Sequence, residues 1–259
     1  MVLVESINYW IPACAGMTLL MGAMKMPANA AELKLLASTA VKTVLEEVIP
    51  QYERAGGDRI AVSIASSAAI MARVKAGETP DMVILTREGI NELVALGKVV
   101  ADSCAPVAAA GLGIAVRRGA PKPDISTADA LKRTLLAAKS IAYTASGASG
   151  LYFARLLEHM GIAEAIKPKA VVLKSGSTGE AVARGEAELA VQMVSELLAA
   201  HAADFVGPLP PEVQNDMIFT AGTLTGSVRG AEATALVKFL NSAAVGAVFK
   251  AKGLEPAIR

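Results

Sequence analysis

Short apolar runs alternate with stretches of helical periodicity along most of the chain. Leu33–Ala37, Arg59–Ala65 and Asp81–Leu85 are apolar runs of strand length, and each predicts a β-strand. Between the first two, apolar residues recur at helical spacing from Ala40 to about Ala55, where Gly56 follows. Strands that alternate with helices in this way predict an α/β fold built on mainly parallel sheets.

The same pattern continues in the middle of the chain, between two stretches that read as connections. Ser140–Tyr143, Ala170–Leu173 and Leu189–Met193 predict strands, while Arg117–Pro123 and the proline-rich Val206–Pro211 predict connecting segments. We therefore expect two lobes. Lobe one is discontinuous and comprises residues 32–116 and 212–259, and lobe two, residues 117–211, is inserted between its halves. The predicted hinge lies at residues 116–119 and 206–225.

The last part of the chain returns to lobe one. Met217–Thr225 alternates like a strand, and Ala231–Lys250 has the periodicity of one long helix, ended by Gly253 and Pro256.

Four predicted strands end in loops of small, hydroxyl-rich residues. These loops are Ser38-Thr39, Ser66-Ser67, Thr144–Gly150 and Lys174–Gly179, two in each lobe. In open α/β sheets, ligands bind beyond the carboxyl ends of the strands, and backbone N–H groups at a helix start favour an anion there. The pattern predicts a cleft between the lobes that grips a small anion. The loops supply the candidate contacts Ser38, Thr39, Ser66, Ser67, Thr144, Ser146, Lys174, Ser175, Ser177 and Thr178.

Each of these hydroxyls could also be an ordinary helix N-cap, because serine and threonine are favoured at that position. Four such loops at matching places favour the anion site, and capping and ligand contact are compatible.

Charge and composition exclude several classes of function. The net charge is +1 and no basic run occurs, which argues against a nucleic-acid partner or an anionic membrane surface. No apolar run reaches the roughly 18–20 residues of a membrane span. His159 and His201 stand alone and the two cysteines are far apart, so we expect no metal site and no disulfide. Phosphate-loop and dinucleotide motifs are absent, and we expect no cofactor.

Residues 1–31 differ from the rest of the chain. Ile11–Met26 is apolar, and Ala28-Asn29-Ala30 fits a small-x-small cleavage pattern, which favours an exported protein. However, Glu5 precedes the apolar run and Lys25 follows it, the reverse of a typical signal peptide. We therefore interpret 1–31 as a signal-like or disordered segment and leave both alternatives open.

Several short matches give the chain a family resemblance. They are Leu35–Ser38, the stretch from Ser66-Ser67 to Asp81–Ile84, Gly185–Val191, Phe239–Ser242 and Lys252–Pro256. The chain resembles the type II periplasmic solute-binding proteins of ABC importers, nearest to the molybdate-binding subset. The resemblance implies a two-lobed fold, a small anionic ligand, a membrane permease as partner and a periplasmic location, and we expect a monomer.

The resemblance also adds two contacts, Ala145 and Gln192, and two departures. Molybdate binders carry a Pro-x-Gly-Arg/His-Tyr type of segment where this chain has Thr144–Gly147, and a tyrosine where it has Gln192-Met193. These departures favour a larger anion, such as a di- or tricarboxylate.

Some proteins of this general pattern are isomerases of unsaturated tricarboxylates such as aconitate. An isomerase needs a general acid or base, for which Lys174, with Glu196 behind it, is the candidate. The sequence thus favours a binding protein without catalytic residues and leaves open an aconitate-type isomerase. A third alternative is a regulatory sensor, although the chain has no recognisable DNA-binding segment.

Overall fold

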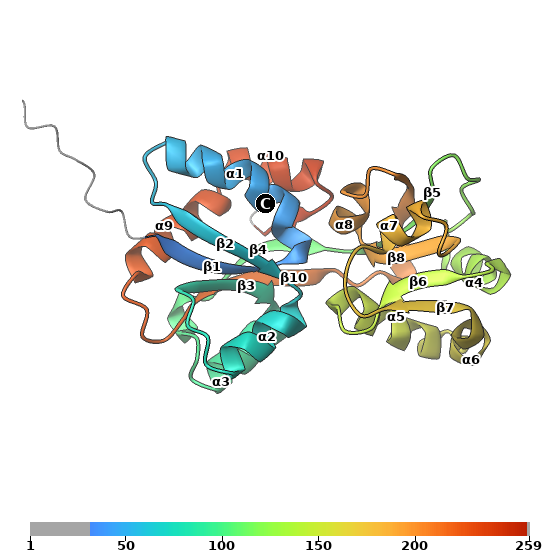
Figure 1. Cartoon of the computed structure of the whole chain (residues 1–259), viewed down its shortest axis with the longest axis horizontal. Helices are drawn as coiled ribbons and strands as arrows, with labels where there is room; N and C mark the ends of the chain where they lie inside the picture. Colours follow the sequence, from blue (N-terminus) through green and yellow to red (C-terminus); the bar gives the residue numbers. More distant parts are fainter. Residues whose placement is uncertain (1–31, 258–259) are drawn as a thin grey trace, which may run out of the picture. The chain divides into compact units, whose positions relative to one another are not determined.

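A computed structural model describes residues 32–257, which fold into two sheets flanked by helices (Figure 1). The predicted signal-like segment 1–31 lies outside the described residues. The two-lobed α/β architecture expected from the sequence is confirmed, with one sheet in each lobe.

The first lobe contains a six-stranded sheet of order β11-β4-β10-β3-β1-β2. Its strands are β1 (Leu33–Ser38), β2 (Ile60–Ala65), β3 (Met82–Thr86), β4 (Ala105–Ala110), β10 (Met217–Thr223) and β11 (Glu255–Pro256). The β2-β1-β3 part is parallel, whereas β10, β4 and β11 pair in antiparallel fashion.

The second lobe contains a five-stranded sheet of order β7-β6-β8-β5-β9. Its strands are β5 (Leu112–Arg117), β6 (Ile141–Thr144), β7 (Ala170–Leu173), β8 (Leu189–Met193) and β9 (Ala203–Pro208). Parallel pairing joins β7, β6 and β8, and antiparallel pairing joins β8, β5 and β9. The prediction of parallel strands is therefore confirmed for the strands that precede the hydroxyl loops. The strands where the chain passes from one sheet to the other, β4, β5, β9 and β10, pair in antiparallel fashion.

Helices cover both faces of each sheet. In the first lobe α1 (Lys42–Arg54), α9 (Gly230–Leu240) and α10 (Ala243–Ala251) lie on one face, and α2 (Ser67–Lys75) and α3 (Arg87–Ala95) on the other. In the second lobe α4 (Ala128–Ala137), α5 (Ala148–His159) and α6 (Ala163–Ile166) lie opposite α7 (Thr178–Ala183) and α8 (Val194–Leu198). Short 3-10 helices occupy Thr39–Val41, Ala101–Ser103, Lys167–Lys169 and Pro211–Val213.

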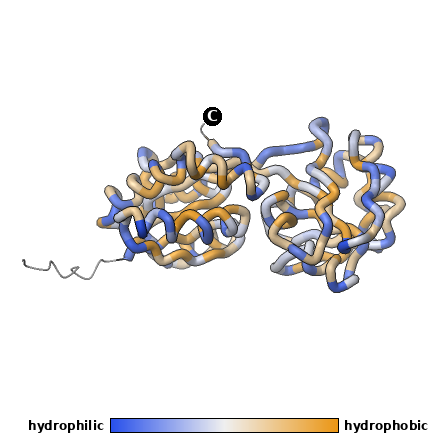
Figure 2. The backbone as a smooth tube through the Cα atoms, turned by 90° about the horizontal axis from the view of Figure 1, so that it is seen from above, coloured by the Kyte–Doolittle hydropathy of each residue, from blue (hydrophilic) through white to orange (hydrophobic). Residues whose placement is uncertain are grey.

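The apolar strands form the centre of each lobe, as the hydropathy colouring in Figure 2 shows. In β8 every residue is buried, and in β3 only the terminal Thr86 is partly exposed. A strand covered by helices on both faces is apolar along most of its length, so its polar residues occur mainly at its end. This is why serine, threonine and glutamine gather where the strands finish.

The chain crosses between the sheets twice, at Gly111 and at residues 209–216. The Gln214 side chain ties the crossings together, accepting from Leu112 N–H at 2.9 Å and donating to Leu112 C=O at 2.8 Å. The predicted lobe boundary after residue 116 falls inside β5, which pairs within the second sheet. We propose that lobe two begins at Leu112, and that the hinge predicted at 116–119 lies instead at Gly111.

One predicted helix is divided. Residues 231–250 form α9 and α10, separated at Asn241-Ser242, where Ser242 Oγ accepts from Val245 N–H and caps the second helix. Among residues 32–257 no single helix is long and apolar enough to cross a membrane; α9 and α10 reach that length and hydropathy only as a pair bent by 65°.

Candidate functional site

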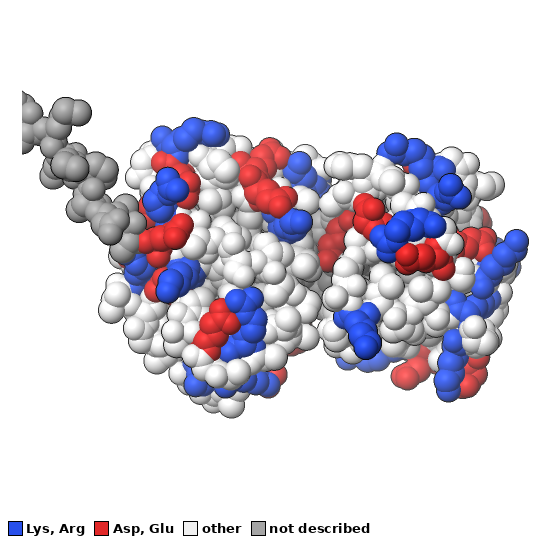
Figure 3. Space-filling model, viewed as in Figure 1, with Lys and Arg blue, Asp and Glu red and all other residues white. Residues whose placement is uncertain are grey.

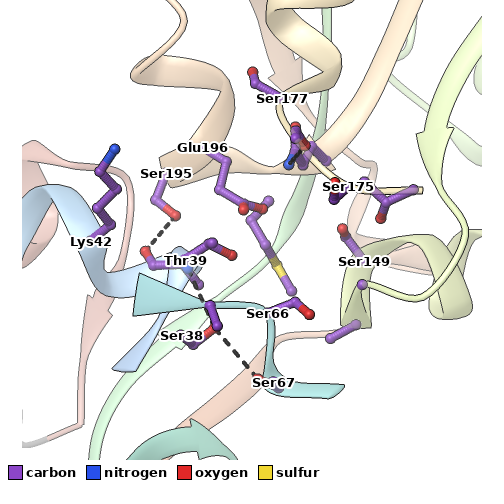
Figure 4. A pocket seen from close by; sticks show the side chains of 18 of the residues that line it. Ser38, Thr39, Lys42, Ser66, Ser67, Ser149, Ser175, Ser177, Ser195 and Glu196 are labelled. Atoms are coloured by element: carbon purple, nitrogen blue, oxygen red, sulfur yellow. Dashed lines mark hydrogen bonds between the residues drawn. The ribbon is translucent and has the colours of Figure 1, made fainter. Parts of the chain in front are cut away.

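A cavity of about 610 Å³ lies where the hydroxyl loops of the two lobes meet (Figure 4). From the first lobe it is lined by the ends of β1 and β2, and from the second by the segments that follow β6, β7 and β8. In Figure 4, Ser38, Thr39 and Ser66 face Ser149 and Ser175 across this space. The structure therefore has the predicted cleft between the lobes, and most of the lining residues that Figure 4 labels carry a hydroxyl group.

On the first-lobe side, a chain of hydrogen bonds ends at Ser38. Thr86 N–H donates to Ser67 Oγ, and Ser67 Oγ donates to Ser38 Oγ, each at 3.4 Å. Ser38 Oγ also accepts from Ala40 N–H at 3.4 Å. Because these contacts use the oxygen lone pairs of Ser38, its hydroxyl hydrogen is left to donate into the cavity.

Ser66 in the first lobe and Ser177 in the second resemble Ser38, because the oxygen of each side chain accepts from a backbone N–H. Ser66 Oγ accepts from Ala69 N–H and caps α2, and Ser177 Oγ accepts from Glu180 N–H and caps α7, both at 3.2 Å. Each hydroxyl thus acts as an N-cap and still has a hydrogen to donate. Capping and ligand binding are compatible here, as the sequence suggested, and the surface offered to a ligand is one of donors.

The third contribution comes from the start of α5. Its N-cap, Gly147, has no side chain to satisfy the first free N–H groups, and Ser149 of the first turn is buried at the cavity. Gly150 allows α5 to begin directly over the end of β6, because a Cβ there would lie 1.7 Å from Thr144 C=O. An uncapped helix start of this kind favours an anion. Thr144 Oγ1 is enclosed beneath it and has no partner among the described residues.

The end of β8 holds the loop before α7. Gln192 Oε1 accepts from Thr178 N–H at 2.8 Å and from Thr178 Oγ1 at 2.9 Å, and Gln192 Nε2 donates to Gly176 C=O at 3.2 Å. Thr178 is fully buried and does not line the cavity. Thr178 was predicted from the sequence to contact the ligand. In the structure its hydroxyl is instead turned towards Gln192.

Glu196 brings a carboxyl group into this cavity of donors. It lies in the first turn of α8, and its carboxyl points between Thr39 and the loops of the second lobe. Burial raises the pKa of Glu196 above its usual range, and the neighbouring Thr39 side chain, Met193 backbone and Gln192 side chain offset part of that rise. Part of the side chain remains open to the cavity, so the carboxyl is both desolvated and within reach of a ligand.

Helix α8 belongs to the second lobe but also packs on the first. Ser195 Oγ donates to Ala40 C=O at 2.8 Å, and both residues are buried. At a second point the turn at Gly253 approaches α8 so closely that a Cβ there would lie 2.7 Å from the Val194 side chain. These contacts fix Glu196 relative to both lobes.

Two lysines and a second glutamate complete the charges at the cavity. Lys42, Lys174 and Glu180 line it and are exposed, and Lys42 also lies 3.7 Å from Glu46. Elsewhere on the face in Figure 3, acidic and basic residues are intermingled. An anion in the cavity would thus be held mainly by neutral donors, with Lys42 and Lys174 at the margin.

Ten of the twelve predicted contacts line the cavity, and their binding role remains a prediction. They are Ser38, Thr39, Ser66, Ser67, Thr144, Ser146, Lys174, Ser175, Ser177 and Gln192. Ala145 and Thr178 are not among the lining residues. Ser149 lines it too, and it lies in the predicted loop Thr144–Gly150 although it was not among the candidate contacts. Ser195, Lys42 and Thr43 line it without having been predicted, because nothing in the local pattern distinguishes them from residues on any helix.

Within residues 32–257, no group of three or more histidine, cysteine, aspartate or glutamate side chains is placed to hold a metal ion. The chemistry available in the cavity is therefore that of hydroxyl and N–H donors, two lysines and one desolvated carboxyl.

Comparison with known sequences gives two matches over most of the chain. The family model for bacterial extracellular solute-binding proteins matches residues 33–255. A protein named aconitate isomerase from a Pseudomonas species is 36% identical over 230 residues, which cover 86% of this chain and 87% of that protein.

Solved structures match at lower identity. The periplasmic molybdate-binding protein of Azotobacter vinelandii superposes with a TM-score of 0.73 at 19% identity, covering 86% of this chain and 98% of that one. The sulfate-binding protein of Mycobacterium tuberculosis superposes with a TM-score of 0.69 at 19% identity, covering 87% of each chain. At this identity the likeness concerns the fold alone.

Proposed function

Because the chain belongs to the bacterial extracellular solute-binding protein family, we propose that its cavity binds a small polycarboxylate anion, and that Glu196 moves a proton on it. The substrate class is an unsaturated tricarboxylate of the aconitate type, and the reaction interconverts its geometric isomers. The observation that carries the proposal is the position of Glu196: a desolvated carboxyl that faces a cavity otherwise built to attract anions.

The cavity suits an organic anion. Its volume of about 610 Å³ lies within the roughly 300–1,000 Å³ of pockets that enclose organic small molecules. Donors converge on it from three directions: Ser38 and Ser66 in the first lobe, the start of α5, and Ser177 with its loop. A ligand with several carboxylates can use donors separated in this way.

A carboxylate beside a bound anion is unfavourable, because like charges repel and this one is also desolvated. The place of Glu196 in the first turn of α8 does not explain its burial, since a glutamate at a helix start can cap the helix while remaining solvated. A group whose pKa is raised by burial, and which faces a ligand cavity, is suited to accept and return a proton.

The chemistry needs no second reactant. Aconitate has a methylene group next to its carbon–carbon double bond. When a base takes one methylene proton, the electron pair moves into the allylic system and towards the carboxylates. Return of the proton to the former vinylic carbon shifts the double bond and yields the other isomer. Hydroxyl and N–H donors around the cavity stabilise the charge that develops on the carboxylate oxygens.

The name of the Pseudomonas relative supports this reaction, since 36% identity extends over most of both chains. Lys174 remains the alternative acid or base suggested by the sequence. It is exposed at the margin of the cavity. We therefore assign Lys174 to balancing ligand charge.

The test combines turnover with binding. Wild-type protein is incubated with cis-aconitate, and the trans isomer is followed by proton NMR. Glu196→Gln should lower kcat by about 10²–10⁴-fold, the usual contribution of a general acid or base. Glu88→Gln, which changes an exposed glutamate in the first turn of α3, is the matched control and should retain full activity.

Binding is measured separately by thermal shift with a panel of anions: both aconitates, the saturated analogue tricarballylate, molybdate and sulfate. At 100 times its dissociation constant a ligand adds about 2.7 kcal/mol to the stability. Stabilisation by tricarboxylates in both wild type and Glu196→Gln, with turnover only in the wild type, is the expected result. Stabilisation by molybdate or sulfate alone would overturn the proposal.

The family supports a second candidate function, delivery of the captured anion to an ABC permease from a periplasmic location. Tight binding of a tricarboxylate without any turnover would identify this function instead. The two share the same cavity and ligand class, and they differ in whether Glu196 reacts or only lies beside the ligand.

A further inference from the structure

Helix α8 is a short helix of five residues, Val194–Leu198, and it carries Glu196 at the cavity. A helix of this length is not stable by itself, so contacts with other elements must set its place. Its N-cap, Met193, makes no side-chain hydrogen bond to the first turn. The position of the Glu196 carboxyl therefore depends on what holds the rest of α8.

Three residues of α8 attach the helix to its surroundings without lining the cavity. Val194 N–H donates to Gly111 C=O at 3.0 Å, which connects the start of α8 to the first crossing between the lobes. Leu197 is 1% exposed and packs in the core of the second lobe. Val194 and Leu198 lie one turn apart and both approach Gly253 of the first lobe, where a Cβ would lie 2.7 Å from each side chain.

Ser195 supplies a further contact, and it is the one nearest to the carboxyl. Its Oγ donates to Ala40 C=O at 2.8 Å, and both residues are only 2% exposed. Ala40 directly follows Thr39, which lines the cavity near the Glu196 carboxyl in Figure 4. The bond thus joins the residue before Glu196 to the residue after Thr39. Any displacement here changes the spacing between the carboxyl and the hydroxyls of the first lobe.

We propose that Ser195 is a positioning residue for Glu196, because its bond to Ala40 places the carboxyl within reach of a ligand that the first-lobe hydroxyls hold. The turn at Gly253 supports the same placement through its contact with α8. The catalytic meaning of this arrangement rests on the proposed function of Glu196, whereas the effect of Ser195 on where Glu196 lies does not.

A simple tie between the lobes would have different consequences from positioning. Loss of a tie lowers stability and, where the lobes close less readily, raises KM while kcat is kept. Loss of positioning lowers kcat and leaves KM nearly unchanged, since the donors Ser38, Ser66 and Ser177 are not part of α8. The division of the effect between kcat and KM therefore separates the two roles.

The first experiment measures kcat and KM for cis-aconitate in Ser195→Ala and Tyr152→Phe. Tyr152→Phe is the matched control, because it removes another hydroxyl that donates to a backbone carbonyl at 2.8 Å, from a residue outside the cavity lining. Ser195→Ala should lower kcat by about 10–100-fold, because a misplacement of about 1 Å at a reacting centre costs about 100-fold and the other contacts of α8 limit the shift. Tyr152→Phe should keep the wild-type kcat. An unchanged kcat in Ser195→Ala overturns the inference.

A second pair of variants displaces α8 while Ser195 stays intact. In Gly253→Ala, α8 or the side chains of Val194 and Leu198 must recede by about 0.7 Å to restore a contact of 3.4 Å. Gly97→Ala is the matched control. Gly97 also lies two residues beyond its helix, with a φ of 66° compared with 77° at Gly253, and a Cβ there meets nothing within 4 Å. Both variants strain the backbone, and only Gly253→Ala should lower kcat. Equal kcat values in the two would overturn the part assigned to the Gly253 turn.

Binding separates the inference from the proposed function. The affinity for tricarballylate, which is saturated and cannot isomerise, is measured at pH 8 for wild type, Ser195→Ala, Glu196→Gln and the double variant. Removing a carboxylate beside a bound anion should tighten binding. If Ser195 sets where Glu196 lies, the gain from Glu196→Gln should differ by about threefold or more between the two backgrounds. The same cycle with Tyr152→Phe should be additive.

The two measurements together distinguish the failure of each proposal. Coupling in the binding cycle without aconitate turnover upholds the positioning role and refutes the isomerase. Additive binding effects of Ser195→Ala and Glu196→Gln overturn the positioning role, whether or not the wild type isomerises aconitate.

Discussion

Gly150→Ala is the perturbation that tests how the start of α5 builds the site. Gly150 is the third residue of α5 and lies against the end of β6. An alanine Cβ at this position would lie 1.7 Å from Thr144 C=O, 2.7 Å from the carbonyl carbon and 2.8 Å from Thr144 Oγ1. Two of these atoms belong to the backbone and cannot move aside by a change of rotamer.

The size of the effect follows from these distances. To reach even 3.0 Å from the carbonyl oxygen, the start of α5 must recede by about 1.3 Å. This displacement carries Ser149 and the free N–H groups away from the cavity. Overpacking costs about 1–3 kcal/mol of stability, and a misplacement of about 1 Å at a reacting centre can cost about 100-fold in rate.

The assay compares Gly150→Ala with Gly246→Ala. Gly246 is also inside a helix, but a Cβ there meets nothing closer than Pro256 at 3.7 Å. Urea unfolding should show Gly150→Ala less stable than wild type, and Gly246→Ala more stable by about 0.5–1 kcal/mol because alanine is the better helix former. Ligand affinity should fall only in Gly150→Ala. Wild-type affinity in that variant would refute the assignment of the α5 start to the site.

Three further changes test other parts of the account. The folded protein holds the Glu196 proton to a higher pH than the unfolded chain does, so the stability of the wild type falls as the pH rises above the ordinary carboxyl range. In urea unfolding, Glu196→Gln should therefore be as stable as wild type near pH 4 and more stable at pH 8. Equal stabilities of the two proteins at both pH values would contradict burial of the charge. Ser195→Ala should lower the unfolding free energy by about 1–3 kcal/mol, since the buried Ala40 carbonyl loses its donor from α8; no loss would show that this contact does not join the lobes. Thr220→Val should be neutral or raise stability by up to about 1 kcal/mol, because the buried Thr220 hydroxyl has no partner among the described residues, and a clear loss would contradict that reading.

Periodicity and capping predicted most of the framework. Ser38, Ser66 and Ser177 were expected at the ends of strands or beside helix starts, and all three cap helices at the cavity. The reason is local: a buried strand that ends at a helix start needs a short side chain to accept from the first N–H groups. Tyr152 in α5 is half-buried, and its hydroxyl donates to Val213 C=O at 2.8 Å.

Elements without a distinct local signal were missed. β4 is alanine-rich and contains Pro106, and β9 ends in Gly207-Pro208, so neither resembles a typical strand. They pair because neighbouring strands supply the ladder, which is a tertiary effect. The break between α9 and α10 was missed because apolar spacing continues through it.

Within the site, the unpredicted features depend on residues far apart in the sequence. Ser195 meets Ala40 across 155 positions, and Thr178 is turned towards Gln192 instead of the ligand. Glu196 was noticed only as a secondary acid or base, because burial, the property that sets it apart, is invisible in a sequence.

The most direct test of the central claim is turnover of cis-aconitate by the wild-type protein in heavy water, followed by proton NMR and mass spectrometry. A base that exchanges its proton with solvent transfers deuterium to the carbon skeleton. We expect trans-aconitate that carries deuterium on a former vinylic or methylene carbon, formed by wild type and about 10²–10⁴-fold more slowly by Glu196→Gln. Recovery of cis-aconitate without isomerisation or deuterium, from protein that the ligand demonstrably stabilises, would contradict this expectation.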